Sequence, residues 1–499
     1  MRNLMFSKVF WMAAVASVIL SGCEKSDDPV VPVEENPILF QGNQIGNGDQ
    51  EFEVVGEHSL PKGTYVLKGW VYVTENAKLT LAPGTIIRGD KNTKAALIVE
   101  PGGTLIAEGT SSEPIVFTSN QPKGQRKPGD WGGVVICGRA KNNKSAMIIE
   151  GGPRTTHGGN NDNDNSGILR YVRIEFAGYP FKTDQEINGL TLGSVGSGTV
   201  MDHIQVSYTN DDSFEFFGGT VNAKYLVAYH GWDDDFDTDN GYSGHLQFLL
   251  GVRNPRLADT SVSNGFESDN DADASSREPR TRAVFSNVTL VGPLGQDASF
   301  VNNDAYINGG SFYPDNGSKL GIFHSAIQIR RNSQLNLFNS VALGYPVGIL
   351  LENDKGGSVQ TSATLGELTV SNVYLAGMGI LGSDKNKSFL DQFSSNASTM
   401  DPSQESFSSS YFKTAALGNA IFQEIADLHL KQPNSMAINP NFGPMEESPL
   451  KGKTGLFDHA LLQNNFFTAV DYIGAFRSDT DEDNWTKGWT EFDPNQAEY

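Results

Sequence analysis

The chain has 499 residues, of which 38% are hydrophobic and 10% aromatic, and this composition excludes an intrinsically disordered protein. Its 59 acidic and 37 basic side chains give a formal net charge of −22, which excludes binding to nucleic acid through the phosphates. Cations, cationic partners or neutral glycans suit so acidic a chain better.

The first 22 residues have the pattern of a lipoprotein signal peptide. Arg2 and Lys8 precede an apolar run at residues 9–20, which is shorter than the roughly 20 residues that span a bilayer. Leu20-Ser-Gly-Cys23 follows and fits a lipobox, in which the cysteine receives a palmitate-type lipid and becomes the mature N-terminus. An ordinary signal peptide with a coincidental cysteine is the alternative. We therefore predict lipidation at Cys23, and with it an anchor in a membrane.

Residues 23–60 are predicted to form an acidic, proline-containing tether and an N-terminal cap. The run Glu24-Lys-Ser-Asp-Asp-Pro29 resembles the surface-export signal of Bacteroidota lipoproteins, which directs a protein to the outer face of the outer membrane. A solvated, stiff linker is the alternative, because Pro29, Pro32 and Pro37 fall in this stretch. The export interpretation predicts a lipid-anchored protein of the outer membrane that is exposed at the cell surface.

Short repeated strands predict the fold of residues 61–390. Leu79-Thr-Leu-Ala-Pro-Gly and Leu97-Ile-Val-Glu-Pro-Gly each alternate apolar and polar residues before a turn, so one face of each strand is buried. Ser286-Asn-Val-Thr-Leu and Ser371-Asn-Val-Tyr-Leu repeat a second form, and 54 glycines supply corners. An all-β, right-handed parallel β-helix fits this pattern. A β-sandwich or a propeller is the alternative, but the repeats lack hairpin turns and a blade-like period near 40 residues.

Three further repeats place aromatic and acidic residues in parallel rows. Ser213-Phe-Glu-Phe-Phe, Asp235-Phe-Asp-Thr-Asp and Gly265-Phe-Glu-Ser-Asp can be overlaid. The overlay predicts an inward stack of Phe214, Phe236 and Phe266, and an outward row of Glu215, Asp237 and Glu267. Phe217, Asp239 and Asp269 follow on the same outer face, as do Gln328 and Arg330 on the next coil. Stacked coils lie about 4.8 Å apart, so several carboxylates should lie close together.

The C-terminal part changes character after residue 390. Residues 391–440 are predicted to be a polar insertion whose best helical candidate runs from Ala415 to Leu430. Residues 441–499 contain Tyr472-Ile-Gly-Ala-Phe and Trp485-Thr-Lys-Gly-Trp, and these aromatics predict a cap over the open end of the β-helix. Cys137 lies in a strand-like run and is expected to be a buried thiol.

Several of these runs resemble a family of surface-exposed β-helix lipoproteins from Bacteroidota and related Gram-negative bacteria. The matching runs are Gly103-Thr-Leu-Ile-Ala-Glu-Gly-Thr, Gly129-Asp-Trp-Gly-Gly-Val-Val-Ile, Thr209-Asn-Asp-Asp-Ser-Phe-Glu-Phe-Phe-Gly-Gly and the closing Tyr-Ile-Gly-Ala-Phe with Gly-Trp-Thr. The resemblance covers most of residues 60–499. It implies a right-handed parallel β-helix at the cell surface, and an association with outer-membrane transporters or adhesion systems, but no particular reaction.

The acidic row is the main candidate site. Like charges in a ladder repel unless something neutralises them, and Ca²⁺ binds carboxylate oxygens readily. We therefore take Glu215, Asp237, Asp239, Glu267 and Asp269 as candidate calcium ligands. A solvated acidic surface on which Arg330 pairs with Asp239 or Asp269 is the alternative. Asp162-Asn-Asp-Asn-Ser-Gly167 has the opening spacing of a calcium loop, but its twelfth position is Arg173, so Asp162 and Asp164 could serve only a looser site.

Two function classes follow from the acidic face. The favoured one is a non-catalytic binding or adhesion module for a glycan, another ligand or a transporter partner. The alternative is a β-helix polysaccharide lyase or glycoside hydrolase that uses Glu215, Asp237, Glu267 and Arg330, since a carboxylate pair can act as acid and base. The sequence contains none of the signature runs of such enzymes, and fold analogy is a weak argument for catalysis. Calcium is the one cofactor that the sequence suggests.

Overall fold

The computed structural model describes residues 42–144, 147–182, 185–314, 316–355, 358–396, 399–434 and 440–499. The predicted signal peptide, the lipidation site Cys23 and the first part of the tether lie outside these residues. None of the helices in the described ranges is both long enough and apolar enough to cross a bilayer.

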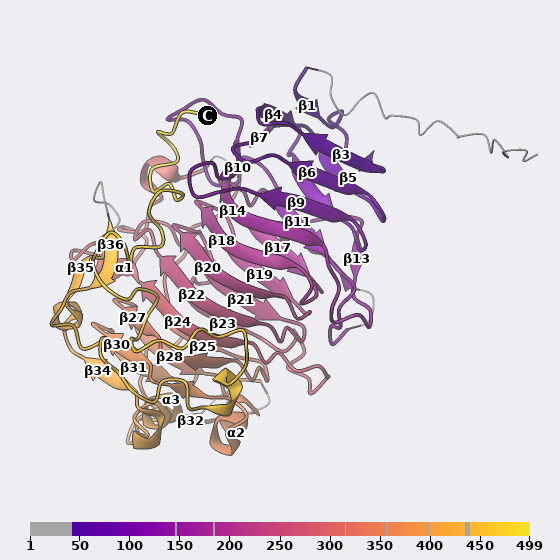
Figure 1. Cartoon of the computed structure of the whole chain (residues 1–499). Helices are drawn as coiled ribbons and strands as arrows, with labels where there is room; N and C mark the ends of the chain where they lie inside the picture. Colours follow the sequence, from indigo (N-terminus) through magenta and orange to yellow (C-terminus); the bar gives the residue numbers. More distant parts are fainter. Residues whose placement is uncertain are drawn as a thin grey trace, which may run out of the picture. The chain divides into compact units, whose positions relative to one another are not determined.

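The described body is an all-β parallel β-helix, as the repeats predicted (Figure 1). Each full coil contributes one short strand to an 11-stranded sheet, and the rest of the coil belongs to a 17-stranded sheet that bends around the remaining sides. In the first and last coils this remainder is two short strands. In the middle coils it is one long strand, as in β14 (Gly167–Glu175), which pairs with both β9 (Thr104–Glu108) and β10 (Ile115–Ser119). Every pair of neighbouring strands within these two sheets is parallel, because each strand bonds to the equivalent strand one coil later.

The 11-stranded sheet carries the candidate site. Its strands are β2 (Phe52–Val54), β5 (Trp70–Val73), β8 (Ala96–Val99), β11 (Gly133–Cys137), β17 (Leu190–Gly193), β19 (Phe214–Phe217), β21 (Phe236–Asp239), β23 (Phe266–Ser268), β25 (Ser325–Ile329), β28 (Val347–Leu351) and β31 (Ile380–Ser383).

The 17-stranded sheet forms the other two sides of each coil. Its strands are β1 (Gln44–Ile45), β3 (Glu57–Leu60), β4 (Thr64–Leu67), β6 (Lys78–Leu81), β7 (Ile86–Gly89), β9 (Thr104–Glu108), β10 (Ile115–Ser119), β14 (Gly167–Glu175), β18 (Val200–Ser207), β20 (Asn222–Tyr229), β22 (His245–Val252), β24 (Val284–Val291), β26 (Asn336–Phe338), β27 (Val341–Leu343), β29 (Val370–Ser371), β30 (Tyr374–Ala376) and β34 (Ala420–Phe422).

In the described part of the chain, four antiparallel strand pairs and several short helices project from the coils. The pairs are β12 (Met147–Ile148) with β13 (Thr156–His157), β15 (Pro180–Lys182) with β16 (Gln185–Glu186), β32 (Phe393–Asn396) with β33 (Thr399–Asp401), and β35 (Leu430–Gln432) with β36 (Asn441–Pro444). The helices are α1 (Pro293–Gln296), α2 (Ser358–Leu365) and α3 (Phe407–Phe412), with 3₁₀ turns η1 (Gly310–Phe312), η2 (Ala415–Leu417), η3 (Ile425–Leu428) and η4 (Ala460–Leu462).

The predicted phenylalanine stack lies in the core. Phe214 pairs in register with Phe236, which pairs with Phe266, and all three side chains are fully buried. The ring centroids are 5.5 Å apart in the first pair and 5.6 Å apart in the second. Because side chains alternate along a strand, the residue after each phenylalanine must point outward. The inward stack therefore fixes the outward acidic row. Cys137 is buried, as predicted.

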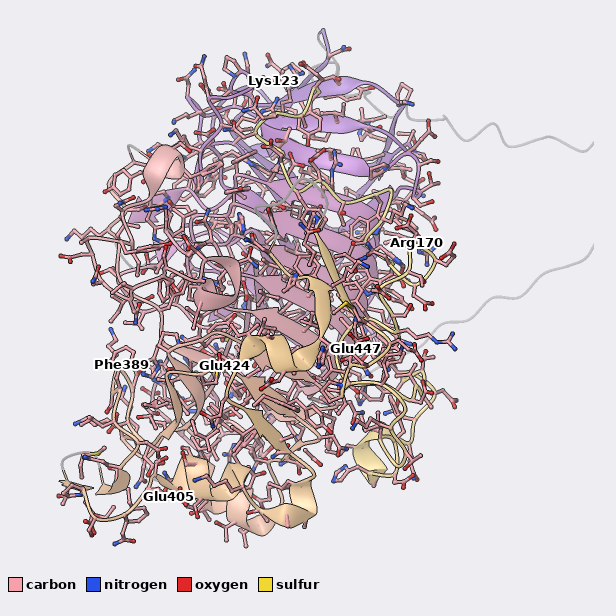
Figure 2. All side chains as sticks on the ribbon, turned by 90° about the vertical axis from the view of Figure 1, so that its left-hand side faces the viewer. Lys123, Arg170, Phe389, Glu405, Glu424 and Glu447 are labelled. Carbon is pink, nitrogen blue, oxygen red and sulfur yellow. The ribbon has the colours of Figure 1, made fainter. Side chains whose placement is uncertain are left out.

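The C-terminal strap, residues 441–499, runs along the outside of the 17-stranded sheet (Figure 1). Trp485 and Trp489 pack on His203, which stacks between Tyr171 and Tyr225 of neighbouring coils. Further along, Glu498 pairs with Lys123 at 2.6 Å, at the opposite end of the stack from Glu405 (Figure 2). The aromatic residues of the strap thus cover a lateral face, whereas the sequence placed them over the open end.

The end of the stack is closed instead by α2 and α3. Val359 and Ala363 of α2 and Phe412 of α3 join the main core, and α3 packs on β28 and β31. The prediction of one helix from Ala415 to Leu430 is wrong. That segment contains η2, the strand β34 and η3. The strand forms because β34 pairs with β30 and so extends the 17-stranded sheet. Gly418, which follows η2, has a φ of +67° and ends that turn.

The boundaries of the coils also extend beyond residues 61–390. Strands β1, β2 and β3 lie in the stretch that the sequence assigned to the tether and cap, and β34 lies within the predicted insertion. Ile45, Phe52 and Val54 from the first of these stretches are buried in the main core.

Candidate functional site

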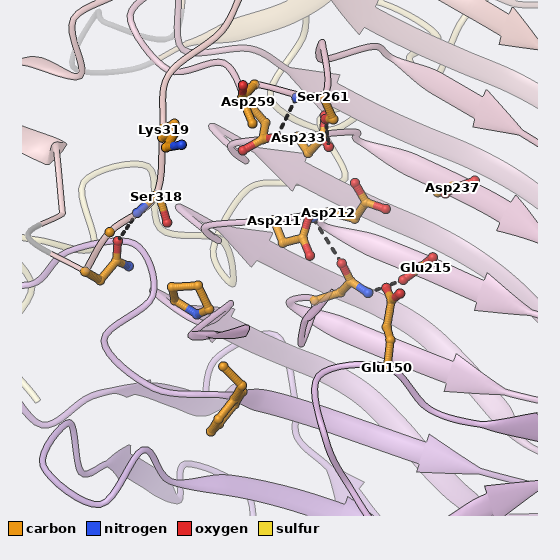
Figure 3. A pocket seen from close by; sticks show the side chains of 16 residues that line it. Glu150, Asp211, Asp212, Glu215, Asp233, Asp237, Asp259, Ser261, Ser318 and Lys319 are labelled. Atoms are coloured by element: carbon orange, nitrogen blue, oxygen red, sulfur yellow. Dashed lines mark hydrogen bonds between the residues drawn. The ribbon is translucent and has the colours of Figure 1, made fainter. Parts of the chain in front are cut away.

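A cavity of about 450 Å³ opens at the corner where the chain enters the 11-stranded sheet (Figure 3). Asp211 and Asp212 lie just before β19, and Asp233 lies just before β21. Glu215 and Asp237 project into the same space from the strands themselves. The lining is completed by Glu150, Pro180, Phe181, Asn188, Asp259, Thr260, Ser261, Asn316, Gly317, Ser318 and Lys319. Among the described residues, seven carboxylates and a single lysine therefore line the cavity.

The outward acidic row lies in register across three coils. Glu215 is the partner of Asp237, and Asp237 is the partner of Glu267. Asn188 donates a hydrogen bond to Glu215. In contrast, Oδ1 of Asp237 is inaccessible to solvent and has no hydrogen-bond partner among the described residues. Asp237 therefore combines a buried oxygen with an unsatisfied bonding capacity, which costs free energy unless something else binds it.

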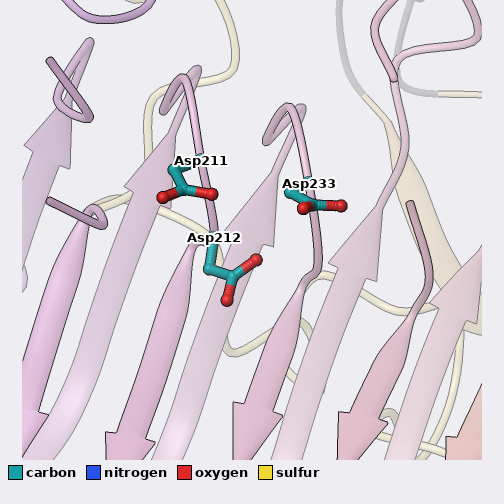
Figure 4. A group of neighbouring side chains, drawn as sticks. All are labelled: Asp211, Asp212 and Asp233. Carbon is teal, nitrogen blue, oxygen red and sulfur yellow. The ribbon is translucent and has the colours of Figure 1, made fainter. Parts of the chain in front are cut away.

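Three groups of carboxylates in the described ranges are close enough to hold a metal ion. They are Asp211 with Asp212 and Asp233, Asp212 with Glu215 and Asp237, and Asp234 with Asp237 and Glu267. In each group the ligand atoms all lie within 4.8 Å of one another. Figure 4 shows the first group, which comes from the turns of two successive coils. The groups share Asp212 and Asp237, so they form one continuous row.

Burial raises the pKa values of these carboxyl groups. Desolvation is the largest cause for Asp212, Glu215 and Asp237, and the negative charges of neighbouring carboxylates raise the pKa values further. Burial also raises the pKa of Asp234, to about 6, and hydrogen bonds from Asn264 limit the rise. Proton uptake and cation binding are two ways to relieve the same repulsion, so this part of the row is prepared for either.

Arginine neutralises the next part of the row. Arg330 contacts Glu267 and forms two hydrogen bonds to Asp269, and Arg331 also reaches Asp269, at 2.7 Å. Arg330 is 8% exposed, so its charge is held in a poorly solvated position. The alternative predicted for the whole face, an acidic surface braced by Arg330, therefore describes Glu267 and Asp269. The charge of Arg330 also lowers the pKa of Asp237, but no arginine in the described ranges forms an ion pair with Glu215 or Asp237.

The remaining predicted ligands lie apart from the metal-competent groups. Asp239 is in register with Phe217 and accepts a hydrogen bond from the backbone of Asn240. Asp162 pairs with the ammonium of Lys141 at 2.6 Å. Asp164 accepts a hydrogen bond from Ser166 at 3.2 Å.

Sequence reasoning missed the turn residues Asp211, Asp212 and Asp233, which line the cavity, and Asp234, which belongs to the third carboxylate group. The signal was present, because the pairs Asp211-Asp212 and Asp233-Asp234 each stand directly before a repeat that begins the outward acidic row. Since the stack places equivalent turns next to each other, the two pairs had to meet. Glu150 and Asp259 come from insertions outside the repeat, and their approach to the cavity follows from no local pattern.

Residues 53–419 match the model of a family described as the pectate-lyase-like β-helix domain. The match covers more than two thirds of the sequence and nearly all of the coils, so the chain belongs to this family. None of the curated proteins matches the chain.

Among solved structures, the crystal structure of the Dettilon tailspike protein (gp208) is similar to the chain at 10% sequence identity, with a TM-score of 0.27. The similarity covers 65% of this chain and 61% of the tailspike protein, so the chain matches about three fifths of that protein's length.

Proposed function

We propose that the acidic cavity binds a carbohydrate, with a divalent cation between the carboxylates and the sugar. The observation that carries the proposal is the group of Asp212, Glu215 and Asp237 at the wall of a cavity of about 450 Å³, since these three carboxylates lie close enough to hold a metal ion and form no ion pair within the described ranges. Cavities of this size hold small ligands, and Asn188, Ser318 and Thr260 offer polar groups suited to hydroxyls. The family takes its name from pectate lyase, and this supports a carbohydrate ligand.

The residues present fit calcium better than a transition metal. Ca²⁺ takes six to eight oxygen ligands in a flexible arrangement, whereas transition metals commonly select imidazole or thiolate. Each of the three groups contains carboxylates alone. Glu215 and Asp237 would contribute oxygens from the strands, Asp212 would contribute from the turn, and sugar hydroxyls could complete the shell.

A glycan array tests this proposal directly. The full chain should bind a subset of glycans in calcium and lose that binding in a chelator. Asp237→Asn should weaken binding at least tenfold, because it removes the carboxylate shared by two groups. Glu405→Gln is the matched control, since Glu405 is an exposed acid at the far end of the stack, paired with Lys413. Binding that ignores both the chelator and Asp237→Asn would contradict the proposal.

Glycan cleavage is a second candidate, favoured by one observation. Glu215 and Asp237 lie on adjacent strands with raised pKa values, and a protonated carboxyl group beside a carboxylate is the arrangement that glycoside hydrolases use. Assays for new reducing ends and for unsaturated products on the glycans that bind would decide. Product formation that is abolished by Glu215→Gln would make the protein an enzyme rather than a binding module.

We further propose that the protein is a surface lipoprotein of the outer membrane, anchored at Cys23. Support comes from the lipobox and from the acidic run that follows it. Cys23→Ser should release the protein from the membrane fraction of its host. Protease treatment of intact cells should remove the body, and complete protection would contradict surface exposure.

An outer-membrane transporter is the partner class that the resemblance to Bacteroidota lipoproteins implies. A surface module that concentrates a glycan would suit such a partner. Crosslinking in intact cells, followed by purification of the lipoprotein, should recover the transporter, and its recovery should require the anchor at Cys23.

A further inference from the structure

A second polar ladder runs along the corner that leads into the 11-stranded sheet. On four successive coils, the residue two positions before the inward side chain of the strand accepts a hydrogen bond from the backbone N–H of the equivalent residue on the next coil. The bonds are Asp212 N to Asn188 Oδ1 at 3.2 Å, Asp234 N to Asp212 Oδ1 at 2.8 Å, Asn264 N to Asp234 Oδ1 at 2.5 Å, and Ser325 N to Asn264 Oδ1 at 3.0 Å.

The ladder shows that asparagine is sufficient for this structural role. Asn188 and Asn264 accept the same bond with an uncharged amide oxygen, on the same corner and in the same geometry. Asp212 and Asp234 are 6% and 4% exposed, so each holds a carboxylate in a poorly solvated position that an amide would occupy at lower cost. The negative charge is therefore not required by the corner itself.

The two aspartates occur on the two coils whose outward carboxylates form no ion pair with an arginine of the described residues. The coil of Asp212 carries Glu215, and the coil of Asp234 carries Asp237. On the coil of Asn188 the equivalent outward residue is Thr191, which is neutral, and on the coil of Asn264 it is Glu267, which Arg330 neutralises. Charge has thus been added to the corner where it increases the repulsion. An added negative charge at such a place is useful if a cation lies there.

Asp212 is the better placed of the two aspartates. Its Oδ1 serves the ladder, and within the described ranges no hydrogen bond reaches its Oδ2. It belongs to two of the three metal-competent groups, the one with Asp211 and Asp233 and the one with Glu215 and Asp237. The unpartnered and buried Oδ1 of Asp237 in the second group independently indicates a missing ligand at this place.

We infer that Asp212 binds cations at two adjacent positions, with Oδ1 held by the ladder and Oδ2 turned to the cavity. This inference rests on the proposed function, because it names the residue that joins two cation positions in the same cavity. It predicts that the negative charge of Asp212 is needed to bind cations, whereas the fold needs only a side-chain oxygen that accepts the ladder hydrogen bond.

Calcium titration of the full chain, purified in detergent, tests the inference. Isothermal titration calorimetry should show calcium binding to the unsubstituted protein and an affinity at least tenfold weaker in Asp212→Asn. The thermal midpoint of Asp212→Asn in chelator should equal or exceed that of the unsubstituted protein, because the asparagine keeps the ladder bond. Asp384→Asn is the matched control. Asp384 is fully buried and accepts bonds from Ser394, Phe407 and Ser408, so its substitution should lower the midpoint and leave the calcium affinity unchanged.

The outcomes separate the inference from the proposed function. If the unsubstituted protein binds no calcium, the cation part of the proposed function fails, and the inference fails with it. If the unsubstituted protein binds calcium and Asp212→Asn binds it equally well, only the inference is overturned. A large fall in the midpoint of Asp212→Asn in chelator would also overturn the inference, because the charge would then be structural.

Discussion

Arg330 donates two hydrogen bonds to Asp269, from Nε to Oδ1 at 3.2 Å and from Nη2 to Oδ2 at 3.0 Å. The same guanidinium contacts Glu267. A planar guanidinium is suited to this two-point contact with a carboxylate, and its charge does not titrate in the physiological range. This one side chain divides the acidic face into a part that the protein neutralises itself, Glu267 and Asp269, and a part, Glu215 and Asp237, that forms no ion pair within the described ranges.

Replacement of Arg330 by glutamine should therefore destabilise the protein strongly. The substitution leaves Asp269 and Glu267 poorly solvated beside each other, and removal of one partner from a buried ion pair typically costs about 3–5 kcal/mol. Chemical unfolding in chelator would measure the loss. Arg330→Gln combined with Asp269→Asn should recover part of the stability, because the double variant removes the charge that was left unpaired. An unfolding curve for Arg330→Gln that overlies that of the unsubstituted protein would contradict this account.

Calcium should stabilise the folded protein. The substitution Asp237→Asn should therefore change the thermal midpoint in opposite directions with calcium and with chelator. At a free calcium concentration 100 times the dissociation constant, binding to the native state alone adds about 2.7 kcal/mol. In chelator, Asp237→Asn removes a repelling charge and should raise the thermal midpoint. In calcium it removes a ligand and should lower the midpoint relative to the unsubstituted protein. Identical midpoints with and without calcium would leave a hydrated acidic surface as the description of this face.

The sequence was sufficient to predict the coils because their signal is local and repeated. The overlay of the runs that begin at Ser213, Asp235 and Gly265 predicted both the register of Phe214 with Phe236 and the outward position of the acidic residues. The path of the C-terminal strap could not be predicted in this way. Its tryptophans pack on His203 and Tyr225, residues more than 250 positions earlier. An aromatic segment has the same sequence pattern whether it covers an end or a side of the β-helix, so the pattern does not predict which face it covers.

The candidate site was predictable only where it coincides with the repeat. Glu215 and Asp237 follow from strand alternation, whereas Asp212 lies in a turn and depends on the hydrogen bond that Asp234 donates to it from the next coil. The pair of Arg330 with Asp269 was one of the alternatives that the sequence predicted, but the sequence did not predict that the same guanidinium also contacts Glu267. The connection that brings Asp259 to the cavity is longer than the turns that lead into β19 and β21, so the repeat does not predict its path.

The phenylalanine stack should be a major source of stability. Phe236 contacts both Phe214 and Phe266 and is fully buried, so Phe236→Ala should cost about 3–5 kcal/mol through lost burial and an unfilled cavity. Phe236→Leu should cost clearly less, because it refills most of the space. The matched control is Phe389→Ala, since Phe389 is 38% exposed and its truncation should change stability little. Chemical unfolding measures all three, and equal effects at positions 236 and 389 would exclude the stack as a core element.

His157 should make the protein less stable as the pH falls. Its ring is 2% exposed, Nδ1 lies 2.8 Å from the hydroxyl of Ser194, and burial lowers its pKa to about 4. Between the usual histidine pKa of about 6.5 and this value, the unfolded chain takes up a proton that the folded chain does not. The stabilising contribution of the neutral ring is therefore complete above about pH 6.5 and is lost as the pH falls toward 4. Between pH 7 and pH 5 the loss should amount to about 2 kcal/mol.

His157→Gln isolates this contribution, because glutamine does not titrate. The variant should lose a constant amount of stability through altered packing against Ser194, but its stability should fall less steeply with acid than that of the unsubstituted protein. The buried carboxyl groups of the cavity have raised pKa values and act in the opposite direction, yet they are the same in both proteins, so their effect cancels in the difference. The difference in unfolding free energy between the unsubstituted protein and His157→Gln, measured in chelator, should therefore be smaller at pH 5 than at pH 7 by about 2 kcal/mol. Parallel pH dependences for the two proteins would show that the ring of His157 is protonated in the folded state as readily as in the unfolded chain.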